Sequence, residues 1–359
     1  VEVPVYITDV LDETLPDQQN ITNTVLLDFD FQGSPEPQTG ASSTVTAKHA
    51  AVQKSVSGTG LPGRLLTYAI NFQLTDYPGA VPGAGASSFV LEDVVADGLR
   101  YDRTVALVVN GASYPITPIE TAGPGPGENT LTWDVAAALP GGALPNGARG
   151  SLTFETTILQ NYADGDPVLA ADSFPNTVQN SYTLTSGAVD TDSSTIDAPI
   201  QPSTTDKTIF SPAPLPTALR PGDQVVFRLE TDIRAGSTAD VVLTDFLPRP
   251  VFDVRDFNAA TDLSVVAPGF IPPASPVVST DPAANSVTLD FGNLTTSRRE
   301  RLEVFLTARV AGAPFADNLF LTNLLSTTYR NSAGDVISGL DAVGLTVGAP
   351  SLEITKGVF

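Results

Sequence analysis

The segment Phe174-Pro175-Asn176-Thr177-Val178-Gln179-Asn180-Ser181-Tyr182 decides how this chain is read, because it has two counterparts elsewhere in the sequence. Ile21-Thr22-Asn23-Thr24-Val25 precedes Phe29, and Leu321-Thr322-Asn323-Leu324-Leu325 precedes Tyr329. In each copy the aromatic residue follows the Asn by six positions, so on a strand both side chains point toward one interior. A buried amide without a partner costs free energy, so each Asn is expected to meet a specific polar group.

Local composition predicts strands almost throughout. The 30 prolines and 29 glycines separate short runs of Val, Ile, Leu, Thr, Phe and Tyr, a pattern typical of all-β proteins. Alternation is clearest at 65–74 and 225–231, and the alanine-rich stretch 135–139 is the one helix that the pattern favours. We therefore predict an all-β fold built from tandem Ig-like β-sandwich domains.

Charge and missing residue types exclude several functions. The chain has 40 acidic and 18 basic residues, which argues against binding nucleic acid or an anionic membrane surface. Cysteine is absent, so disulfides, thiolate nucleophiles and thiolate metal sites are impossible. No apolar run reaches the roughly 18 residues of a membrane helix. Methionine is also absent, even at position 1, so we expect this sequence to be an internal piece of a longer polypeptide.

Other landmarks recur at a spacing near 150 residues. Lys54, Lys207 and Lys356 are 153 and 149 residues apart, Asp93 and Asp245 are 152 apart, and Asn176 and Asn323 are 147 apart. Pro62-Gly63 matches Pro221-Gly222, 131–135 matches 287–291, and 151–155 matches 301–305. Landmarks that keep their order and spacing indicate tandem copies of one domain. We predict the last strands of a preceding repeat at 1–47, complete Ig-like repeats at 48–200 and 201–349, and the first strand of a following repeat at 350–359.

Each predicted repeat thus carries a Lys in its first strand, an Asp in a middle strand and an Asn in a late strand. The sets are Lys54, Asp93 and Asn176, then Lys207, Asp245 and Asn323, while Asn23 and Lys356 belong to the neighbouring repeats. Burial between two sheets lowers the pKa of a lysine and raises the pKa of an aspartic acid. A neutral amine could then attack the Asn carbonyl carbon and release ammonia, with the Asp as proton shuttle.

This reaction would run once per domain, so it predicts spontaneous isopeptide formation and not an enzyme. A simpler interpretation stays open. An Asp before a turn is often only a turn residue, and an Asn at a strand entrance often only bonds the backbone. The recurrence of all three residue types at matching positions favours the isopeptide hypothesis over surface decoration.

The combination of Lys-x-Val, Pro-Gly, an alternating strand, Val-x-Asp, Trp-Asp and Asn-Thr-Val resembles the Ig-like conserved repeats of very large bacterial and archaeal surface proteins. The chain departs from that pattern at Asn323, which is followed by Leu-Leu, and at Leu289, which stands where Trp133 does. The arrangement is also similar to isopeptide-containing domains of Gram-positive adhesins and pili, a resemblance that implies mechanical stability. In those domains the acid is Glu or Asp. Glu92 points to the opposite face of the strand from Asp93, and Thr244 stands at the position of Glu92 in the second repeat. Asp93 and Asp245 are therefore predicted to be the catalytic acids.

Other candidate sites are weaker. The single His49 has no Cys or second His for a triad or a zinc site, so we interpret it as structurally incidental. Trp133 follows strand alternation and is predicted to be a core residue and not a sugar platform. The segment 123–127 has glycines but no Lys and no following helix, so it is predicted to be a loop and not a phosphate-binding site.

Acidic loops offer oxygen ligands for calcium. Asp190, Asp192 and Asp197 form the candidate set, with Asp164 and Asp166 nearby in sequence and Asp335 and Asp341 in the second repeat. Carboxylates of this kind suit Ca²⁺, but none follows the EF-hand spacing. A solvated acidic linker is the alternative interpretation. No cofactor is required.

These observations predict a structural stalk or filament segment of a large extracellular surface protein. Its expected partners are neighbouring repeats of the same polypeptide, with lateral self-association as a further option, and no nucleic acid or membrane insertion. An adhesive or carbohydrate-binding module is the alternative, and it would require a cluster of exposed aromatic side chains. A polysaccharide-acting enzyme would need paired carboxylates facing one cleft, and no sequence signal selects such a pair.

Overall fold

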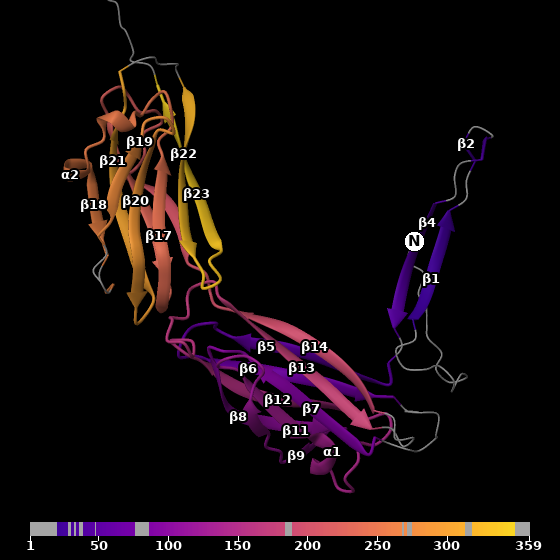
Figure 1. Ribbon diagram of the computed structural model, residues 1–359. Coiled ribbons are helices and arrows are strands. Elements are labelled where there is room, and N and C mark those ends of the chain that lie inside the picture. Colours follow the sequence, from indigo (N-terminus) through magenta and orange to yellow (C-terminus); the bar gives the residue numbers. More distant parts are fainter. Residues whose placement is uncertain are drawn as a thin grey trace, which may run out of the picture. The chain divides into compact units, whose positions relative to one another are not determined.

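A computed structural model describes residues 20–27, 30–31, 34–35, 39–46, 48–75, 86–183, 189–267, 269–270, 275–312 and 318–348. Between residues 20 and 46 the side chains of Thr24 and Ser42 alone are described. The chain packs as two compact units (Figure 1). Unit 1 comprises Val1–Gly58, Leu65–Thr157 and Pro175–Asp197, and unit 2 comprises Thr59–Arg64, Ile158–Phe174 and Ala198–Phe359. The domain boundaries expected from the sequence stay a prediction.

Unit 1 contains two five-stranded sheets. The first has the order β5-β6-β12-β8-β9, with β5 Ala50–Gly58, β6 Leu65–Leu74, β12 Arg149–Ile158, β8 Leu99–Val109 and β9 Ala112–Tyr114. The second has the order β10-β11-β7-β13-β14, with β10 Ile119–Ala122, β11 Asn129–Asp134, β7 Ser88–Val95, β13 Ser173–Thr183 and β14 Val189–Pro199. The chain crosses repeatedly from one sheet to the other, and the buried side chains of both sheets form the core between them.

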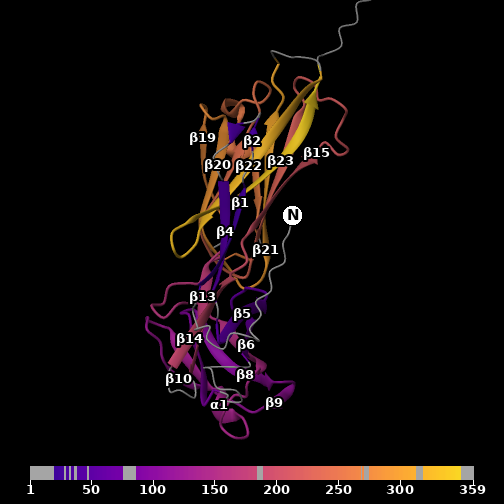
Figure 2. The same ribbon diagram turned by 90° about the vertical axis from the view of Figure 1, so that its right-hand side faces the viewer.

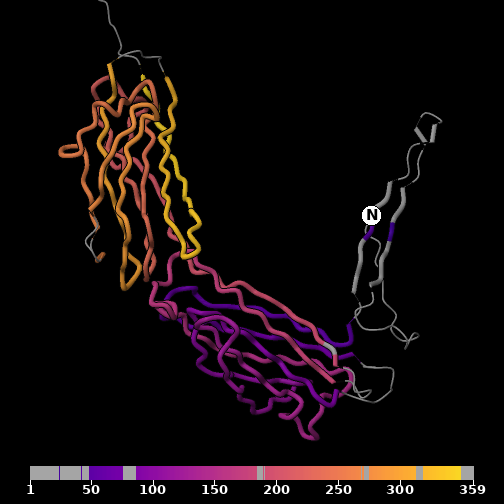
Figure 3. Tube along the Cα trace, in the orientation of Figure 1, coloured from indigo at the N-terminus to yellow at the C-terminus, as the bar shows by residue number. Residues whose placement is uncertain are grey.

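Unit 2 has the same arrangement of two sheets, but its first sheet has four strands in place of five. Its first sheet is β15-β16-β21-β18, with β15 Thr204–Ser211, β16 Gln224–Ile233, β21 Glu300–Arg309 and β18 Leu263–Val266. Its second sheet is β19-β20-β17-β22-β23, with β19 Val277–Asp281, β20 Ser286–Thr296, β17 Gly236–Phe246, β22 Leu319–Arg330 and β23 Val336–Val347. The Cα trace shows β22 turning directly back into β23 (Figure 3). The fold is therefore all-β, as the sequence predicts.

Helices are short and lie at strand connections. The expected helix forms as α1 Val135–Ala138, where the Asp134 side chain accepts a hydrogen bond from the Ala137 amide, as N-cap residues do. A second helix, α2 Ala259–Asp262, and a 3₁₀ turn at Val254–Asp256 were not expected. Both start at a polar residue whose side chain binds a following backbone amide, a local signal too short to show helical periodicity.

A separate hairpin precedes β5. β1 Asn20–Leu27 pairs with β4 Thr39–Thr46, and β2 Asp30–Phe31 pairs with β3 Ser34–Pro35. Asn23 lies opposite Ser43, and in unit 2 Asn323 lies opposite Val343. The separations 43 − 23 and 343 − 323 are both 20, so the two Asn-bearing hairpins share one register. Phe29 and residues 1–19 of the predicted preceding repeat lie outside the described residues.

Strand alternation places the repeated residues inside. Asn176 and Tyr182 on β13 are both buried, as are Asn323 and Tyr329 on β22, which confirms for these two copies that the Asn and its aromatic residue face one interior. β6 and β16 cover the two predicted alternating stretches.

One expected equivalence is wrong by two residues. Ile70 lies opposite both Lys54 and Leu152 in unit 1, and Leu229 lies opposite both Lys207 and Val304 in unit 2. Segment 151–155 therefore corresponds to 303–307 and not to 301–305. A shift of two keeps the same residues facing inward, so the alternating pattern alone could not detect it.

We predict that substitutions on the two faces of β7 differ strongly in their effect on the stability of unit 1. Phe89 is fully buried and its ring packs against Phe72 and Tyr182, with centroids 5.2 and 6.3 Å away, whereas Glu92 on the same strand is exposed. Phe89→Ala should destabilise unit 1 by about 3–5 kcal/mol, because such a substitution leaves a cavity. Urea unfolding followed by the fluorescence of Trp133, the single tryptophan, measures this. Glu92→Ala is the control and should change stability by less than about 0.5 kcal/mol; equal effects would contradict the assigned faces.

Candidate functional site

Three strands bring one polar set together inside unit 1. Lys54 projects inward from β5 at the edge of the first sheet, while Asp93 and Asn176 project inward from β7 and β13, which are paired in the second sheet. The side chains of Lys54 and Asp93 are 0% exposed, and Asn176 is 0% exposed. The set therefore spans the interior from one sheet to the other.

Lys54 makes two polar contacts with side chains of the opposite sheet. Its Nζ donates to Asp93 Oδ2 and to Asn176 Oδ1, the latter at 2.5 Å. Asp93 Oδ1 and Asn176 Nδ2 have no hydrogen-bond partner of normal geometry among the described residues. The amine thus lies against the carbonyl oxygen of the Asn side chain, with one carboxylate oxygen beside it.

Aromatic rings surround the amine. The centroids of Tyr68 and Phe154 lie 5.0 and 5.5 Å from Lys54 Nζ. The Phe154 ring is stacked on Tyr68 at 5.1 Å and packs against Trp133 at 5.2 Å. Ring faces attract a cation but supply no hydrogen bonds, so Asp93 and Asn176 carry the polar interactions of the ammonium.

Burial moves both ionisable groups toward their neutral forms. It lowers the pKa of Lys54 from 10.5 to about 8, although the charge and hydrogen bond of Asp93 oppose this. Burial likewise raises the pKa of Asp93 above its ordinary value, against the opposing attraction of Lys54 and a smaller contribution from Asn176. Desolvation disfavours the charged state of each group, so a proton can be shared between them at little cost.

Unit 2 contains a second set on the equivalent strands β15, β17 and β22. Lys207 Nζ donates to Asp245 Oδ2, and both side chains are almost fully buried. Burial lowers the pKa of Lys207 and raises the pKa of Asp245, opposed in each case by the partner charge. Asn323 is 0% exposed and lies close enough to Asp245 to favour its charged form.

The two sets differ at the Asn. Neither Oδ1 nor Nδ2 of Asn323 makes a hydrogen bond of normal geometry with the described part of the chain. In unit 1, by contrast, Asn176 Oδ1 accepts a hydrogen bond from Lys54. Lys207 Nζ lies 5.0 Å from the ring centroid of Phe227, which occupies the Tyr68 position. The lysine therefore hydrogen-bonds to both the Asp and the Asn in unit 1, whereas in unit 2 its side-chain partner is Asp245.

A feature that the sequence analysis missed positions each Lys strand. The Lys54 amide donates to Ser194 Oγ on β14 at 3.0 Å, and the Lys207 amide donates to Asp341 Oδ2 on β23 at 2.6 Å. In unit 2, β15 lies beside β23 (Figure 2). The last strand thus binds the first through side chains, which fixes the backbone at the Lys. The shared separation from the repeated Asn, 18 residues in both cases, is a signal that could have revealed it.

The calcium candidates do not form a cluster among the described residues. Asp192 accepts hydrogen bonds from Lys48 Nζ at 2.5 Å and from the Val52 amide at 3.0 Å. Asp197 is exposed and lies five residues away on β14, hence on the opposite face, and the Asp190 side chain lies outside the described residues. Within the described ranges no three Asp, Glu or His side chains form a metal-ligand group. Calcium binding stays a prediction.

The remaining acidic candidates have local hydrogen-bond roles. Asp164 Oδ1 accepts from the Asp166 amide within a turn, and Asp335 exchanges hydrogen bonds with Asn331 in the β22–β23 turn. Asp341 binds the Lys207 amide. Of the predicted residues in neighbouring repeats, the Asn23 side chain and Lys356 lie outside the described residues.

The structure also places the weaker candidates. Trp133 is 0% exposed and its Nε1 donates to Thr104 Oγ1 at 2.9 Å, which confirms a core position. Residues 123–127 form a loop in which the Gly125 amide donates to Glu128 Oε2 at 2.7 Å. His49 is half-buried immediately before β5. No helix in the described part of the chain is long and apolar enough to cross a membrane.

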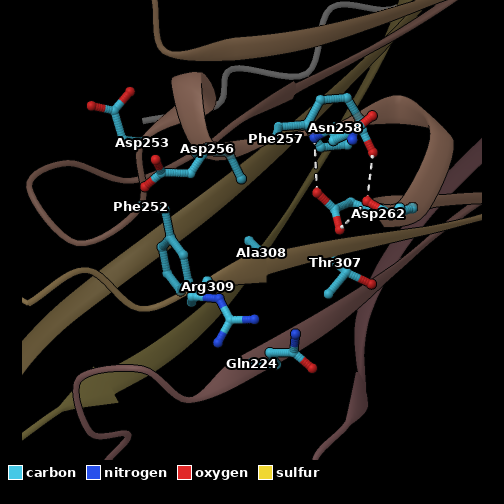
Figure 4. Close-up of a pocket in the computed structure, with 12 residues that line it drawn as sticks. Gln224, Phe252, Asp253, Asp256, Phe257, Asn258, Asp262, Thr307, Ala308 and Arg309 are labelled. Carbon is cyan, nitrogen blue, oxygen red and sulfur yellow. Dashed lines mark hydrogen bonds between the residues drawn. The ribbon is translucent and has the colours of Figure 1, made fainter.

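Unit 2 has a pocket of about 200 Å³ beside α2 (Figure 4). Three aspartates and one arginine line it, namely Asp253, Asp256, Asp262 and Arg309. The Asp262 carboxylate accepts from the Asn258 amide at 2.8 Å and from Thr261 Oγ1 at 3.1 Å, and Asp253 accepts from the Arg255 amide at 2.9 Å. These two carboxylates stabilise local turns, so the pocket gives no support to paired-carboxylate chemistry.

Neither a protein-family model nor a curated protein sequence matches the chain. Among solved structures it is similar to the C-terminal domain of AspA, an antigen I/II-family protein of Streptococcus pyogenes, with 12% identity over 84% of this chain and 100% of that one and a TM-score of 0.36. It is similar to the major pilin subunit BcpA of Bacillus cereus, with 11% identity over 92% and 74% of the two chains and a TM-score of 0.30. The major pilin SpaD of Corynebacterium diphtheriae has 11% identity over 82% and 61% and a TM-score of 0.34. At TM-scores this low the β-sandwich assignment rests on the sheet topology above.

The buried pair predicts a specific pattern of stability. Asp93→Ala leaves Lys54 buried without a counter-charge, and adding Lys54→Met removes that charge. The double variant should therefore be more stable than Asp93→Ala by about 3–5 kcal/mol at neutral pH. Both variants lack the Asp93 carboxyl, so the comparison does not depend on any covalent bond. Urea unfolding followed by Trp133 fluorescence measures it.

The difference should shrink as the pH rises. In Asp93→Ala the folded-state pKa of Lys54 lies below its unfolded value of 10.5, so the unfolded chain binds more protons in this range and stability rises with pH. The double variant has no lysine at this position and should lack this rise. A constant difference between pH 7 and pH 10 would show that Lys54 is not a buried titrating group.

Proposed function

We propose that this chain is a load-bearing stalk or filament segment of a large extracellular surface protein, whose two units are closed by isopeptide bonds. One bond joins Lys54 to Asn176 and the other joins Lys207 to Asn323. The observation that carries the proposal is the contact in unit 1, where a fully buried lysine amine lies 2.5 Å from the amide oxygen of Asn176 and beside Asp93. A surface ion pair would not require this burial.

The chemistry needs no added reagent. Lys54 transfers a proton to Asp93, and the neutral amine attacks the side-chain carbonyl carbon of Asn176. The C–Nδ2 bond then breaks as the attacking nitrogen gives up one proton to Nδ2, which leaves as ammonia. Asp93 passes the proton that it took from Lys54 to this ammonia, which is released as ammonium. A secondary amide remains, no atom changes oxidation state, and Asp93 ends in its starting form. Asp245 would have the same role in unit 2.

The position of the bonds suits a load-bearing role. Each bond would join the first strand of a unit, β5 or β15, to the penultimate strand of the opposite sheet, β13 or β22. The closed loops would span 122 residues in unit 1 and 116 in unit 2. Tension that enters at the first strand would pass through the covalent bond to the strand near the exit, so most of the sandwich would carry no load. The closed loop also restricts the unfolded chain, as a disulfide does.

Each unit would react once, so the proposal includes no enzymatic turnover. Neighbouring repeats of the same polypeptide are the proposed partners, and lateral self-association would extend the array. An adhesive or carbohydrate-binding module is the alternative. One observation favours it: the exposed ring of Phe210 packs against Phe305 at 4.8 Å on unit 2.

Intact mass tests the crosslinks directly. The wild-type chain should be lighter than its sequence mass by two ammonia molecules, because each bond releases one. Lys54→Arg should restore the mass of one ammonia, since a guanidinium stays protonated and cannot attack. Lys207→Arg should restore the other. Glu92→Gln, which removes an exposed carboxylate next to Asp93, is the control and should retain both losses. A wild-type mass with no loss would disprove the proposed bonds.

The pH dependence tests the role of Asp93. The reactive state holds one proton on the Lys54–Asp93 pair, and its population is constant between the two apparent pKa values of the pair. The upper value is set by Lys54, whose pKa is lowered to about 8. Ammonia loss from unit 1 after refolding should therefore be independent of pH near neutrality and fall about tenfold per unit above pH 8.

Below the raised pKa of Asp93, the rate of ammonia loss should decrease as the pH falls. Peptide mass spectrometry of samples quenched at intervals gives the rate for each unit separately. A rate that instead rises up to pH 8 and stays constant above it would show a free amine attacking without a proton from Asp93.

A further inference from the structure

The two units place different side chains at one position beside the lysine. Tyr68 on β6 and Phe227 on β16 each lie two residues before the residue opposite the lysine. Their ring centroids are both 5.0 Å from the respective Nζ. The rings are therefore equivalent in position, and they differ by one hydroxyl group.

The hydroxyl of Tyr68 has no hydrogen-bond partner of normal geometry in the described part of the chain. Tyr68 is 0% exposed. A buried donor without a partner costs free energy, and Phe at the equivalent position of unit 2 shows that the fold accepts a ring without it. Some other property of unit 1 is therefore expected to require this hydroxyl.

Asn176 lies beside this hydroxyl. Burial raises the pKa of Tyr68, and an interaction with the Asn176 side chain opposes that rise. Because the raised pKa keeps the phenol protonated throughout the neutral range, it remains a hydrogen-bond donor there. Asn176 Oδ1 lies 2.5 Å from Lys54 Nζ and the centroid of the Tyr68 ring lies 5.0 Å from the same nitrogen, so the ring and the amide oxygen both flank the amine.

We propose that the Tyr68 hydroxyl donates a hydrogen bond to Asn176 Oδ1 when negative charge develops on that oxygen, and that unit 1 consequently forms its isopeptide bond faster than unit 2. This inference rests on the proposed crosslinking. As Lys54 Nζ bonds to the Asn176 carbonyl carbon, the π-electron pair of the carbonyl moves to Oδ1. It returns when the C–Nδ2 bond breaks and ammonia leaves, so the Tyr68 proton is shared during the step and never transferred.

The surroundings of Oδ1 explain why one donor matters. Before attack, Oδ1 accepts a hydrogen bond from Lys54 Nζ. During attack the same nitrogen bonds to the carbon, so that hydrogen bond is lost as the charge on the oxygen grows. A donor buried among apolar side chains stabilises such charge strongly, and removal of one donor of this kind slows acyl transfer by about 10²–10³-fold.

Unit 2 is a natural comparison. It has Phe227 at the Tyr68 position, and Leu306, opposite Phe227, replaces Phe154. Asn323 Oδ1 also has no hydrogen-bond partner of normal geometry among the described residues of unit 2. The developing charge on Asn323 would thus receive no help from this ring position.

The test measures both units in one chain. Full-length chain is synthesised in vitro, held in urea so that neither unit folds, and diluted into buffer at pH 7. Samples are quenched in acid at intervals, and peptide mass spectrometry locates each ammonia loss. Wild type should lose ammonia from unit 1 first. Tyr68→Phe should slow that loss by about 10²-fold or more and leave unit 2 unchanged, whereas Phe227→Tyr should speed the loss from unit 2.

Two further readouts separate catalysis from a structural effect. Tyr68→Phe should refold at the wild-type rate by Trp133 fluorescence. Its rate of ammonia loss should fall at the same low and high pH values as in wild type, because Lys54 and Asp93 are unchanged. Equal rates of ammonia loss in wild type and Tyr68→Phe would overturn the role of Tyr68 and leave the crosslinks intact. Absence of any loss from either wild-type unit would instead overturn the crosslinks, and the Tyr68 proposal with them.

Discussion

The burial of a lysine ammonium between two apolar sheets is the constraint on which both units depend. Transfer of a charge out of water is costly, and only a close counter-charge and further hydrogen bonds offset it. Asp93 and Asp245 supply that charge from the middle strand of the facing sheet. The lysine therefore fixes the relative positions of the first strand and the opposite sheet, which an apolar contact alone would define less strictly.

The first strand is held at this point from a second direction. Its backbone amide at the lysine donates to a side chain of the last strand, Ser194 in unit 1 and Asp341 in unit 2. A strand at a sheet edge exposes unpaired amides that can pair with other chains. Occupation of one such amide by a side chain protects the edge and sets the depth of the lysine in the core. The acidic residue Asp341 thus has a structural use that a purely solvated linker residue would not have.

The two units show how one scaffold can hold the same polar set in different surroundings. Unit 1 packs Tyr68, Phe154 and Trp133 around Lys54, and unit 2 has Phe227, Leu306 and Leu289 at these positions. Larger rings fill the volume around the amine and limit where Asn176 can lie. In unit 2 the smaller side chains accompany an Asn323 amide that makes no hydrogen bond of normal geometry with the residues that the structure describes. The surroundings, more than the three polar residues, distinguish the units.

The sequence by itself determined the all-β class, the strands on which the polar residues lie and the inward direction of Asn176, Asn323 and Trp133, because side chains alternate with a period of two along any strand. It also predicted the members of each polar set, since they recur at a nearly constant spacing. Only the tertiary structure decided which strands are neighbours, and with this the pairing register of β21, the proximity of Tyr68 to Asn176 and the contact of Asp341 with Lys207. These depend on how two sheets stack, and a local pattern that is unchanged by a shift of two residues contains no information about the partner across the core.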